Sequence, residues 1–359
     1  MINVIGDLLG SSGYCSHVRN LANALFKQTE VRVSTGLPQG WETQVNDNEL
    51  LMIKQQPVKG EINLIITLPH QWKLFTGVGR NWAYCVWEGN KVPKSFIEDF
   101  LNPDIEYILV PSMHTKEAIC QTIRESATTE DYMDGILHNK IKIIPHGVDL
   151  TKFYSQEKNN EVFTFVANKG FRNIEDRGGI QYLIQAYLEE FTNLDKVELL
   201  IKLNPAYGIG PIDDLIKKYI KPNSPTVKIN ADNMPYNKLV DLYNQGDVFV
   251  SPTRADAFNL PGLEAHACGI PTIQTNFGGQ IDYMKEDVDF FVDYDLVEVE
   301  HEVMYEGISW ANVKIEDLKK KMRYAYAHQE EMKLRGQKAL ENAKNWTWDN
   351  SAKIVLTLE

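Results

Sequence analysis

Short apolar runs alternate with longer amphipathic stretches along almost the whole chain. The first run, Ile2 to Ile5, is followed by glycines and then by Val18, Leu21 and Leu25 at helical spacing. This spacing predicts a helix over residues 15–27. Further strands are expected over residues 31–33, 62–66, 82–88, 107–110, 141–144, 163–167, 199–202, 227–230 and 248–250, and further helices over 182–191, 234–243, 263–268, 315–338 and 350–356. Strands that alternate with helices indicate an α/β protein with parallel sheets.

A polar segment at residues 155–161 divides this alternation into two halves. The length of 359 residues suits two domains of ordinary size, each able to bury its own core. The apolar run at 163–167 restarts the alternation after the polar segment, which favours a second doubly wound domain. A hydrophobic content of 43% and a charged content of 24% are typical of a soluble globular protein.

The charge and the cysteines restrict the partners and the compartment. A net charge of −12 argues against a general nucleic-acid-binding protein. The four cysteines are widely scattered and form no CxxC pair, which favours a reducing compartment without a disulfide framework or a zinc site. The amino-terminal residues lack the basic flank of a signal peptide, and no apolar run has the length of a bilayer span, so we expect a cytoplasmic protein. A local basic patch would still allow peripheral membrane contact, and the oligomeric state stays open.

Residues 248–279 carry the most informative pattern in the chain. A short apolar strand is stopped by Ser251 and Pro252, and the helix formers that follow end at Gly269. Two acids, Asp256 and Glu264, bracket the loop and the start of this helix. The free amides and the positive dipole end of a helix amino terminus favour an anion such as a pyrophosphate.

This stretch resembles the donor-site signature of the GT-B retaining glycosyltransferases, in particular family 4. That family has Glu-Gly-Phe-Gly-Leu-Pro-x-x-Glu-Ala-x-Ala-x-Gly-x-Pro. The positions that agree are Phe258, Leu260, Pro261, Glu264, Ala265, Ala267, Gly269 and Pro271. Asp256 stands for the first glutamate, and Ala257 and Asn259 replace glycines. Glycine and proline residues end strands and helices in any α/β protein, which would explain the glycine and the prolines of this stretch. It would not explain two acids that flank Phe-x-Leu-Pro.

The resemblance implies a GT-B fold, in which two Rossmann-like domains face an interdomain cleft. The acceptor-side domain would span residues 1–153, with residues 346–359 packing back on it, and the nucleotide-sugar-binding domain would span 154–345. The implied activity is sugar transfer with retention of configuration from a UDP- or GDP-linked donor. The acceptor would be a glycan, a lipid-linked molecule or a protein. No permanently bound cofactor and no metal ion are expected.

By the same resemblance, several residues of the second domain would bind the donor. Arg177 and Lys202 would stabilise the leaving diphosphate, because charge builds on it as the glycosidic bond breaks. Amides around Phe258, Asn259 and Leu260 would help them. Glu264 would hold the ribose hydroxyls and Asp256 the sugar hydroxyls. A further cation would come from Lys169 or Arg172, and Asn230 ends a strand where the backbone usually meets the nucleobase.

Three residues of the first domain are further candidates. Gly13 closes a glycine- and serine-rich turn of the phosphate-cradling kind. The resemblance implies that Gly13 would let the backbone approach the donor phosphates or the acceptor. His70 follows the strand at 62–66 and would lie at the mouth of the cleft, although a lone histidine is as often a surface or core residue. Glu88 would contact the acceptor or form a structural ion pair.

Two other functions remain open at this stage. An epimerase of the same fold would need paired carboxylates in the first domain, and a non-catalytic relative would be favoured by the shorter acid at Asp256. The acidic pairs Asp287/Asp289 and Asp293/Asp295 match a metal-holding pattern of another glycosyltransferase fold. We give that pattern little weight, since GT-B enzymes neutralise the diphosphate with side chains.

Overall fold

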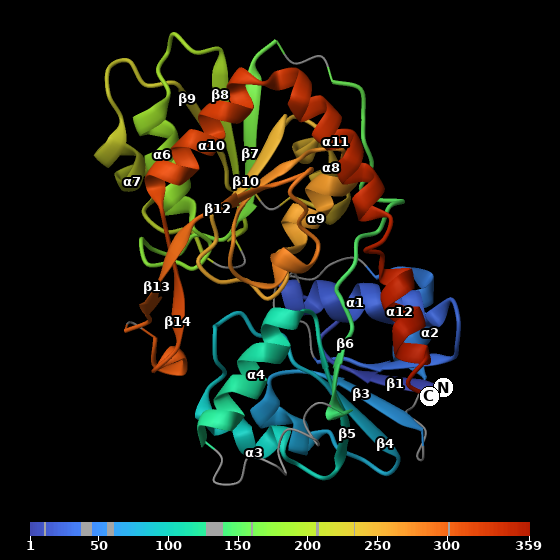
Figure 1. The fold of residues 1–359 in the computed structure, drawn as a ribbon. Helices are drawn as coiled ribbons and strands as arrows, with labels where there is room; N and C mark the ends of the chain where they lie inside the picture. The colour runs from blue at the N-terminus through green and yellow to red at the C-terminus, as the bar shows by residue number, and fades with distance from the viewer. Residues whose placement is uncertain are drawn as a thin grey trace. The chain divides into compact units, whose positions relative to one another are not determined.

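The structure is a computed structural model that describes residues 1–10, 12–36, 45–55, 61–126, 139–158, 161–205, 208–232, 234–300 and 302–359. Ser11 of the glycine-rich turn and residues 159–160 of the polar segment lie outside the described residues. The chain divides into two units (Figure 1). The first unit comprises Met1–Gly147, Glu302–Ile308 and Trp348–Glu359, and the second comprises Val148–His301 and Ser309–Thr347.

The first unit is built on a parallel sheet of six strands in the order β2-β1-β3-β4-β5-β6. The strands are β1 (Ile2–Ile5), β2 (Val31–Ser34), β3 (Ile62–Ile66), β4 (Arg80–Tyr84), β5 (Ile105–Val110) and β6 (Ile141–Ile143). From β1 the chain first adds β2 on one side and then crosses to β3 on the other. The order of the strands therefore reverses between β1 and β3, and such a switch point is where ligands of open α/β sheets bind.

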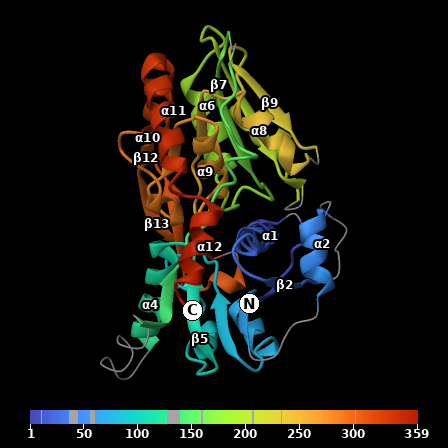
Figure 2. The same ribbon diagram turned by 90° about the vertical axis from the view of Figure 1, so that its right-hand side faces the viewer.

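The helices of this unit are α1 (Gly13–Phe26), α2 (Asp47–Lys54), α3 (Ile97–Phe100), α4 (Met113–Ser126) and α12 (Trp348–Leu356). Helix α1 begins two residues before the expected start because the Ser12 side chain caps it, accepting a hydrogen bond from the Cys15 amide at 3.2 Å. Although α12 comes from the end of the chain, it lies alongside α1 (Figure 2).

A row of buried asparagines joins three neighbouring strands of the first sheet. Asn3, Asn63 and Asn81 are register partners on β1, β3 and β4. The Asn3 amide donates to Asn63 Oδ1 at 3.1 Å, and the Asn63 amide donates to Asn81 Oδ1 at 3.0 Å. A register shift of one residue would turn these side chains to the opposite face, so the row helps to fix the pairing of the strands.

Replacing Asn63 by alanine is expected to lower the free energy of unfolding by about 1–3 kcal/mol, since the Asn3 and Asn81 side chains would each lose a buried partner. Urea unfolding followed by circular dichroism measures this change. Asn48, exposed on α2 of the same unit, supplies the control, because its replacement by alanine removes no hydrogen bond of the described residues. Equal stability of the two variants would show that the row contributes nothing.

The second unit repeats the design with a second parallel sheet of six strands, in the order β12-β11-β10-β7-β8-β9. Its strands are β7 (Phe163–Lys169), β8 (Val197–Leu203), β9 (Thr226–Asn230), β10 (Val248–Ser251), β11 (Thr272–Thr275) and β12 (Phe290–Val292). Its helices are α6 (Ile180–Glu190), α7 (Ile212–Tyr219), α8 (Leu239–Tyr243), α9 (Leu260–Ala267), α10 (Ile315–Ala327) and α11 (Gln329–Ala343). A hairpin of β13 (Tyr294–Glu298) and β14 (Ser309–Val313) is antiparallel.

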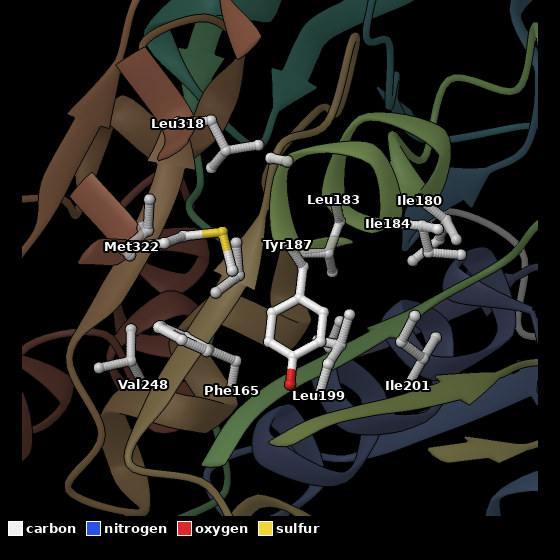
Figure 3. Close-up of a cluster of buried hydrophobic side chains, with 14 of the residues drawn as sticks. Phe165, Ile180, Leu183, Ile184, Tyr187, Leu199, Ile201, Val248, Leu318 and Met322 are labelled. Carbon is white, nitrogen blue, oxygen red and sulfur yellow. The ribbon is translucent and has the colours of Figure 1, made fainter. Parts of the chain in front are cut away.

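Both faces of the second sheet are buried, which explains its near-continuous apolar strands. Phe165 of β7 faces a core formed with α6 and α10, which also contains Tyr187, Leu199 and Met322 (Figure 3). Val166, the next residue of β7, faces the opposite core with helices α8 and α9. The two parallel six-stranded sheets with their helices confirm the expectation of two doubly wound α/β domains. No helix in the described ranges has both the length and the apolar character that a membrane span requires.

Candidate active site

The order of the strands places the candidate site of the second unit between β7 and β10. These strands are neighbours, although the chain leaves β7 toward β8 and β9 on one side and returns to β10 on the other. Lys169 is the last residue of β7, and the loop with Asp256 follows β10. Ligand crevices of open α/β sheets form at the carboxyl ends of the strands at such a switch point.

Two candidate residues, Lys202 and Asn230, form one row with Asn168 across the carboxyl end of this sheet. Lys202 of β8 is the register partner of Asn168 on β7 and of Asn230 on β9. Asn230 Oδ1 accepts a hydrogen bond from the Asp232 amide at 3.0 Å. The row lies in the last two residues of each strand, so its side chains belong to the same edge as Lys169.

Lys202 brings a buried positive charge to this edge, with only 3% of the residue exposed. Its Nζ donates to the carbonyl oxygens of Leu203 at 2.5 Å and Asp232 at 2.8 Å. No carboxylate of the described residues forms an ion pair with it. Burial lowers the pKa of the Lys202 ammonium, because a charge is poorly solvated there. A buried cation without a carboxylate partner is suited to an anionic ligand.

Asp256 folds back on its own loop. Its Oδ1 accepts hydrogen bonds from the amides of Phe258 at 3.1 Å and Asn259 at 2.6 Å, and its Oδ2 accepts one from Lys169 Nζ at 2.7 Å. Burial alone would raise the pKa of Asp256, but the charges of Lys169 and Arg177 outweigh it and bring the pKa to about 2. The carboxylate is therefore ionised at neutral pH.

Asn259 occupies a backbone position that explains its place in the signature. It is left-handed, with φ 58° and ψ 60°, directly before α9, and it is the one non-glycine residue of the described chain with a positive φ. Asparagine tolerates this conformation better than other non-glycine residues, so it can replace the glycine of the resembled signature. Its Oδ1 accepts from Lys169 at 2.6 Å, and its Nδ2 donates to Ser251 Oγ at 3.1 Å and to Gln274.

Glu264 lies on α9 and is 5% exposed. Its carboxylate accepts hydrogen bonds from the hydroxyls of Tyr236 at 2.9 Å and Tyr243 at 2.6 Å, and the Tyr243 oxygen accepts one from the Asn168 amide at 3.0 Å. Burial raises the pKa of Glu264, and the two tyrosine bonds offset this only in part. Each carboxylate oxygen keeps a further acceptor position, which a ligand hydroxyl could use.

Arg177 is half-buried in the loop before α6. Its carbonyl oxygen accepts hydrogen bonds from the Arg254 amide at 2.8 Å and from Thr253 Oγ1 at 3.0 Å, which fixes the loop on the segment after β10. Its guanidinium donates to the Ala255 carbonyl at 3.4 Å. Arg172, by contrast, is exposed and lies 3.5 Å from the Asp176 carboxylate. Of the two candidates for the further cation, Lys169 contacts the loop between Asp256 and Glu264, called the signature loop below.

One side chain of the signature loop, Phe258, packs in the hydrophobic core. The Phe258 side chain is 1% exposed and packs near Tyr283 and Trp346, with ring centroids 5.5 Å and 6.0 Å away. Its amide and that of Asn259 both donate to Asp256. Leu260, half-buried, begins α9. The two tyrosines that bind Glu264, Tyr236 and Tyr243, were not expected from the sequence to belong to the site.

The first-unit candidates follow the two strands at the other switch point. Gly13 is exposed at the first position of α1, after β1. His70 is exposed after β3 in a short 3₁₀ turn (η1, Pro69–Leu74), with its ring centroid 6.0 Å from that of Phe96. Placement of either residue at an interdomain cleft stays a prediction.

Glu88 is buried within the first unit, with 8% exposed. Its carboxylate accepts a hydrogen bond from the Tyr305 hydroxyl, and its carbonyl oxygen lies 2.9 Å from His114 Nε2. The expected strand over 82–88 is wrong at its carboxyl end, because β4 stops at Tyr84, although the Cys85 amide still donates to the Leu109 carbonyl of β5 at 2.9 Å. The end of this strand carries no glycine or proline signal before Gly89.

The acidic pairs do not form a metal centre in the described part of the chain. Asp289 is buried and lies 2.7 Å from His266 Nε2, whereas Asp287 is exposed and pairs with Lys338 at 3.1 Å. Asp295 pairs with Lys314 at 3.3 Å. Within the described ranges, no three His, Cys, Asp or Glu side chains are grouped to hold a metal ion.

Comparison with known proteins finds a family match in the second half of the chain and relatives that match part of it. Residues 162–303 match the family described as Glycosyl transferases group 1. A probable sucrose-phosphate synthase of Thermosipho melanesiensis is 23% identical over 170 residues, which cover 46% of this chain and 39% of the relative. The capsular polysaccharide biosynthesis glycosyltransferase CapM of Staphylococcus aureus is 27% identical over 176 residues, covering 46% and 44%. The matches thus span less than half the length of these relatives.

Solved structures match over nearly the whole chain at low identity. A sucrose-phosphate synthase of Thermosynechococcus elongatus has a TM-score of 0.68 at 15% identity, covering 99% of this chain and 97% of the other. WaaG, a glycosyltransferase of lipopolysaccharide biosynthesis, has a TM-score of 0.64 at 14% identity, covering 100% and 99%. The chain thus has the GT-B fold, and its residues 162–303 are similar to the family Glycosyl transferases group 1.

Proposed function

We propose that the protein is a retaining glycosyltransferase that moves a sugar from a nucleotide-diphosphate sugar to an acceptor hydroxyl. The observation that carries this proposal is Lys202, a buried ammonium at the carboxyl edge of the second sheet that has no carboxylate partner among the described residues. A diphosphate would supply the missing negative charge. Arg177, held on the neighbouring loop, would supply the second cation.

Each group of the site has a task in this reaction. The bond between the anomeric carbon and the diphosphate oxygen breaks, and the leaving oxygen gains the negative charge that Lys202 and Arg177 stabilise. The acceptor hydroxyl attacks from the same face of the sugar, and its proton passes to the leaving phosphate oxygen. Glu264, oriented by two tyrosine hydroxyls, would accept hydrogen bonds from the ribose hydroxyls. Asn230 would lie near the nucleobase.

The names of related structures suggest which donors to try first. One neighbour is TarM of S. aureus, solved with UDP and α-GlcNAc-glycerol, and another is HepE of Anabaena, solved with UDP and glucose. We therefore propose a UDP-linked donor first and a GDP-linked donor second, with a glycan as the first acceptor class to test and lipid-linked or protein acceptors after it. Consistent with its scattered cysteines, we propose a cytoplasmic enzyme.

A thermal-shift screen tests the donor site. The probes are UDP, GDP, ADP, UDP-glucose, UDP-N-acetylglucosamine and GDP-mannose, each with and without magnesium. A ligand at 100 times its dissociation constant should add about 2.7 kcal/mol of stability. We expect a clear shift with one base, independent of magnesium, and its loss in Lys202→Met.

Lys217→Met provides the matched control. Lys217 is exposed on α7 and pairs with Asp214 at 3.2 Å, so its replacement should leave the shift unchanged. The melting temperature of each variant without ligand shows whether it folds. The proposal fails if no nucleotide shifts the wild-type protein, or if Lys202→Met binds the nucleotide as tightly as Lys217→Met does.

A further inference from the structure

The contacts of Lys169 and Asp256 suggest that the two residues have different roles in binding the donor sugar. We propose that Lys169 donates a hydrogen bond to a hydroxyl of the donor sugar, and that Asp256 is a positioning residue that acts through Lys169 and the loop. This inference rests on the proposed function. It concerns only how the sugar is held, not how the diphosphate is bound.

The Asp256 carboxylate is largely occupied by its own surroundings. Of about four acceptor positions on a carboxylate, two on Oδ1 are taken by the amides of Phe258 and Asn259, and one on Oδ2 is taken by Lys169. Each of these bonds is internal to the loop or joins it to β7. Asp256 therefore already performs a structural task, and a sugar would find at most one acceptor position on it.

Lys169 provides a hydrogen-bond donor that complements a sugar hydroxyl oxygen. An ammonium has three N–H donors, and the described residues provide acceptors for two of them, Asp256 Oδ2 at 2.7 Å and Asn259 Oδ1 at 2.6 Å. The Lys169 side chain is only 8% exposed. The third N–H is thus a buried donor for which the described chain supplies no acceptor, and leaving such a donor unsatisfied costs free energy.

The charges around Lys169 indicate what it binds. Asp256 already neutralises its charge at 2.7 Å, whereas Lys202 on the next strand has no carboxylate partner among the described residues. The anionic diphosphate is therefore better served by Lys202, and the spare N–H of Lys169 is suited to a neutral acceptor. A sugar hydroxyl oxygen is such an acceptor. Lys169 also ends β7 at the switch point with β10, where a ligand is expected.

Rigid neighbours hold Lys169 in place. Asn259, which accepts its second hydrogen bond, donates to Ser251 Oγ at 3.1 Å, and its carbonyl oxygen accepts from the Tyr283 hydroxyl at 3.0 Å. An ammonium fixed by two such acceptors can select one hydroxyl configuration over another, since a misplaced hydroxyl would leave the third N–H without a partner.

Binding of modified donors tests the proposal, because a hydroxyl that accepts a hydrogen bond differs from one that donates. The probes are the nucleotide diphosphate alone, the nucleotide sugar that binds in the screen above (UDP-glucose for a uridine site), and its analogues in which each hydroxyl in turn is replaced by hydrogen or by fluorine. Fluorine can accept a hydrogen bond weakly but cannot donate one. Calorimetry gives the dissociation constants.

We expect one position at which the deoxy analogue binds the wild-type protein about 10-fold more weakly and the fluoro analogue binds more tightly than the deoxy analogue. In Lys169→Met the penalty for that deoxy analogue should vanish, while the nucleotide diphosphate alone binds as before. Lys169→Arg should restore part of the penalty, and Asp256→Asn should reduce it without abolishing it, because the asparagine oxygen can still accept from the loop amides.

The opposite pattern would overturn the inference. If the fluoro analogue binds no better than the deoxy analogue, or the penalty persists in Lys169→Met and vanishes in Asp256→Asn, the sugar hydroxyl donates to Asp256. If Lys169→Met loses the nucleotide diphosphate itself, Lys169 serves the phosphates instead. Failure of every nucleotide to bind the wild-type protein would overturn the proposed function, which is a distinct result.

Discussion

Replacing Asp289 by alanine is expected to lower the free energy of unfolding of the second unit by about 3–5 kcal/mol. The residue is 2% exposed. Its Oδ1 accepts hydrogen bonds from His266 Nε2 at 2.7 Å and from the Thr272 hydroxyl and amide at 2.7 Å and 3.2 Å, and its Oδ2 accepts one from the Lys285 amide at 2.9 Å. Alanine would leave all of these buried donors without an acceptor, and each such loss is costly.

The neighbouring aspartate makes a matched control for this prediction. Asp287 is exposed and pairs with Lys338, so Asp287→Ala should leave unfolding unchanged within error. Urea unfolding followed by tryptophan fluorescence and circular dichroism measures both variants, with separate transitions of the two units fitted separately. A similar loss in both variants would mean that the buried network adds nothing.

The Asp289 network also bears on the site, since His266 and Glu264 are two residues apart on α9. His266 links α9 to β11 through Asp289 and Thr272, and its Nδ1 lies 3.4 Å from the Asn342 amide of α11. Glu264 projects from the same helix toward Tyr236 and Tyr243. A shift of α9 in Asp289→Ala should therefore weaken nucleotide binding as well as stability.

The strands were the most predictable part of the fold. The apolar run at 62–66 matches β3, and the runs at 163–167 and 199–202 lie within β7 and β8. The physical reason is burial on both faces, which makes a parallel strand a short continuous apolar run. Turns at the ends of these strands depend on tertiary contacts, and this is why the run at 82–88 continued four residues past the end of β4 at Tyr84.

Breaks within helical patterns were harder to predict. The charged stretch at 315–338 was expected as one helix, but α10 ends at Ala327 and α11 begins at Gln329 around His328. No glycine or proline marks this break. The expected helix over 234–243 is α-helical only from Leu239, since Pro235 starts a 3₁₀ turn. The β13–β14 hairpin was not predicted.

Most donor-side candidates were predicted from the resemblance of their residues to a known family, and Lys202 also from a local pattern. Lys202 stood out because a charged residue ends an apolar strand, and the structure buries its ammonium at the sheet edge. Lys169 carries the same signal at the end of β7, but the choice between it and Arg172 required contacts with Asp256, 87 residues away. Contacts at such separations depend on strand order, which the sequence pattern does not specify.

Replacing Gly179 by alanine is expected to lower the free energy of unfolding by about 3 kcal/mol and to weaken nucleotide binding. Gly179 has φ 81° directly before α6, and a Cβ built on it would lie 1.8 Å from the Pro252 carbonyl oxygen. Since that oxygen belongs to backbone, no side-chain rotation can relieve the clash. The loop before α6 would have to move away from the segment after β10.

Gly208→Ala is the control that separates the effect of the steric clash at Gly179 from the effect of the positive φ. It has the same φ of 81°, but the nearest atom to its built Cβ is Arg172 Cγ at 3.9 Å, so Gly208→Ala should cost only about 1 kcal/mol. The functional loss in Gly179→Ala should come from Arg177, whose carbonyl is held by Thr253 and Arg254 beside Pro252. If Gly179→Ala is destabilised but binds the nucleotide diphosphate normally at a temperature where it is folded, Arg177 does not need this loop position. A joint loss of stability and affinity, absent in Gly208→Ala, would instead tie the close approach of the two loops to diphosphate binding.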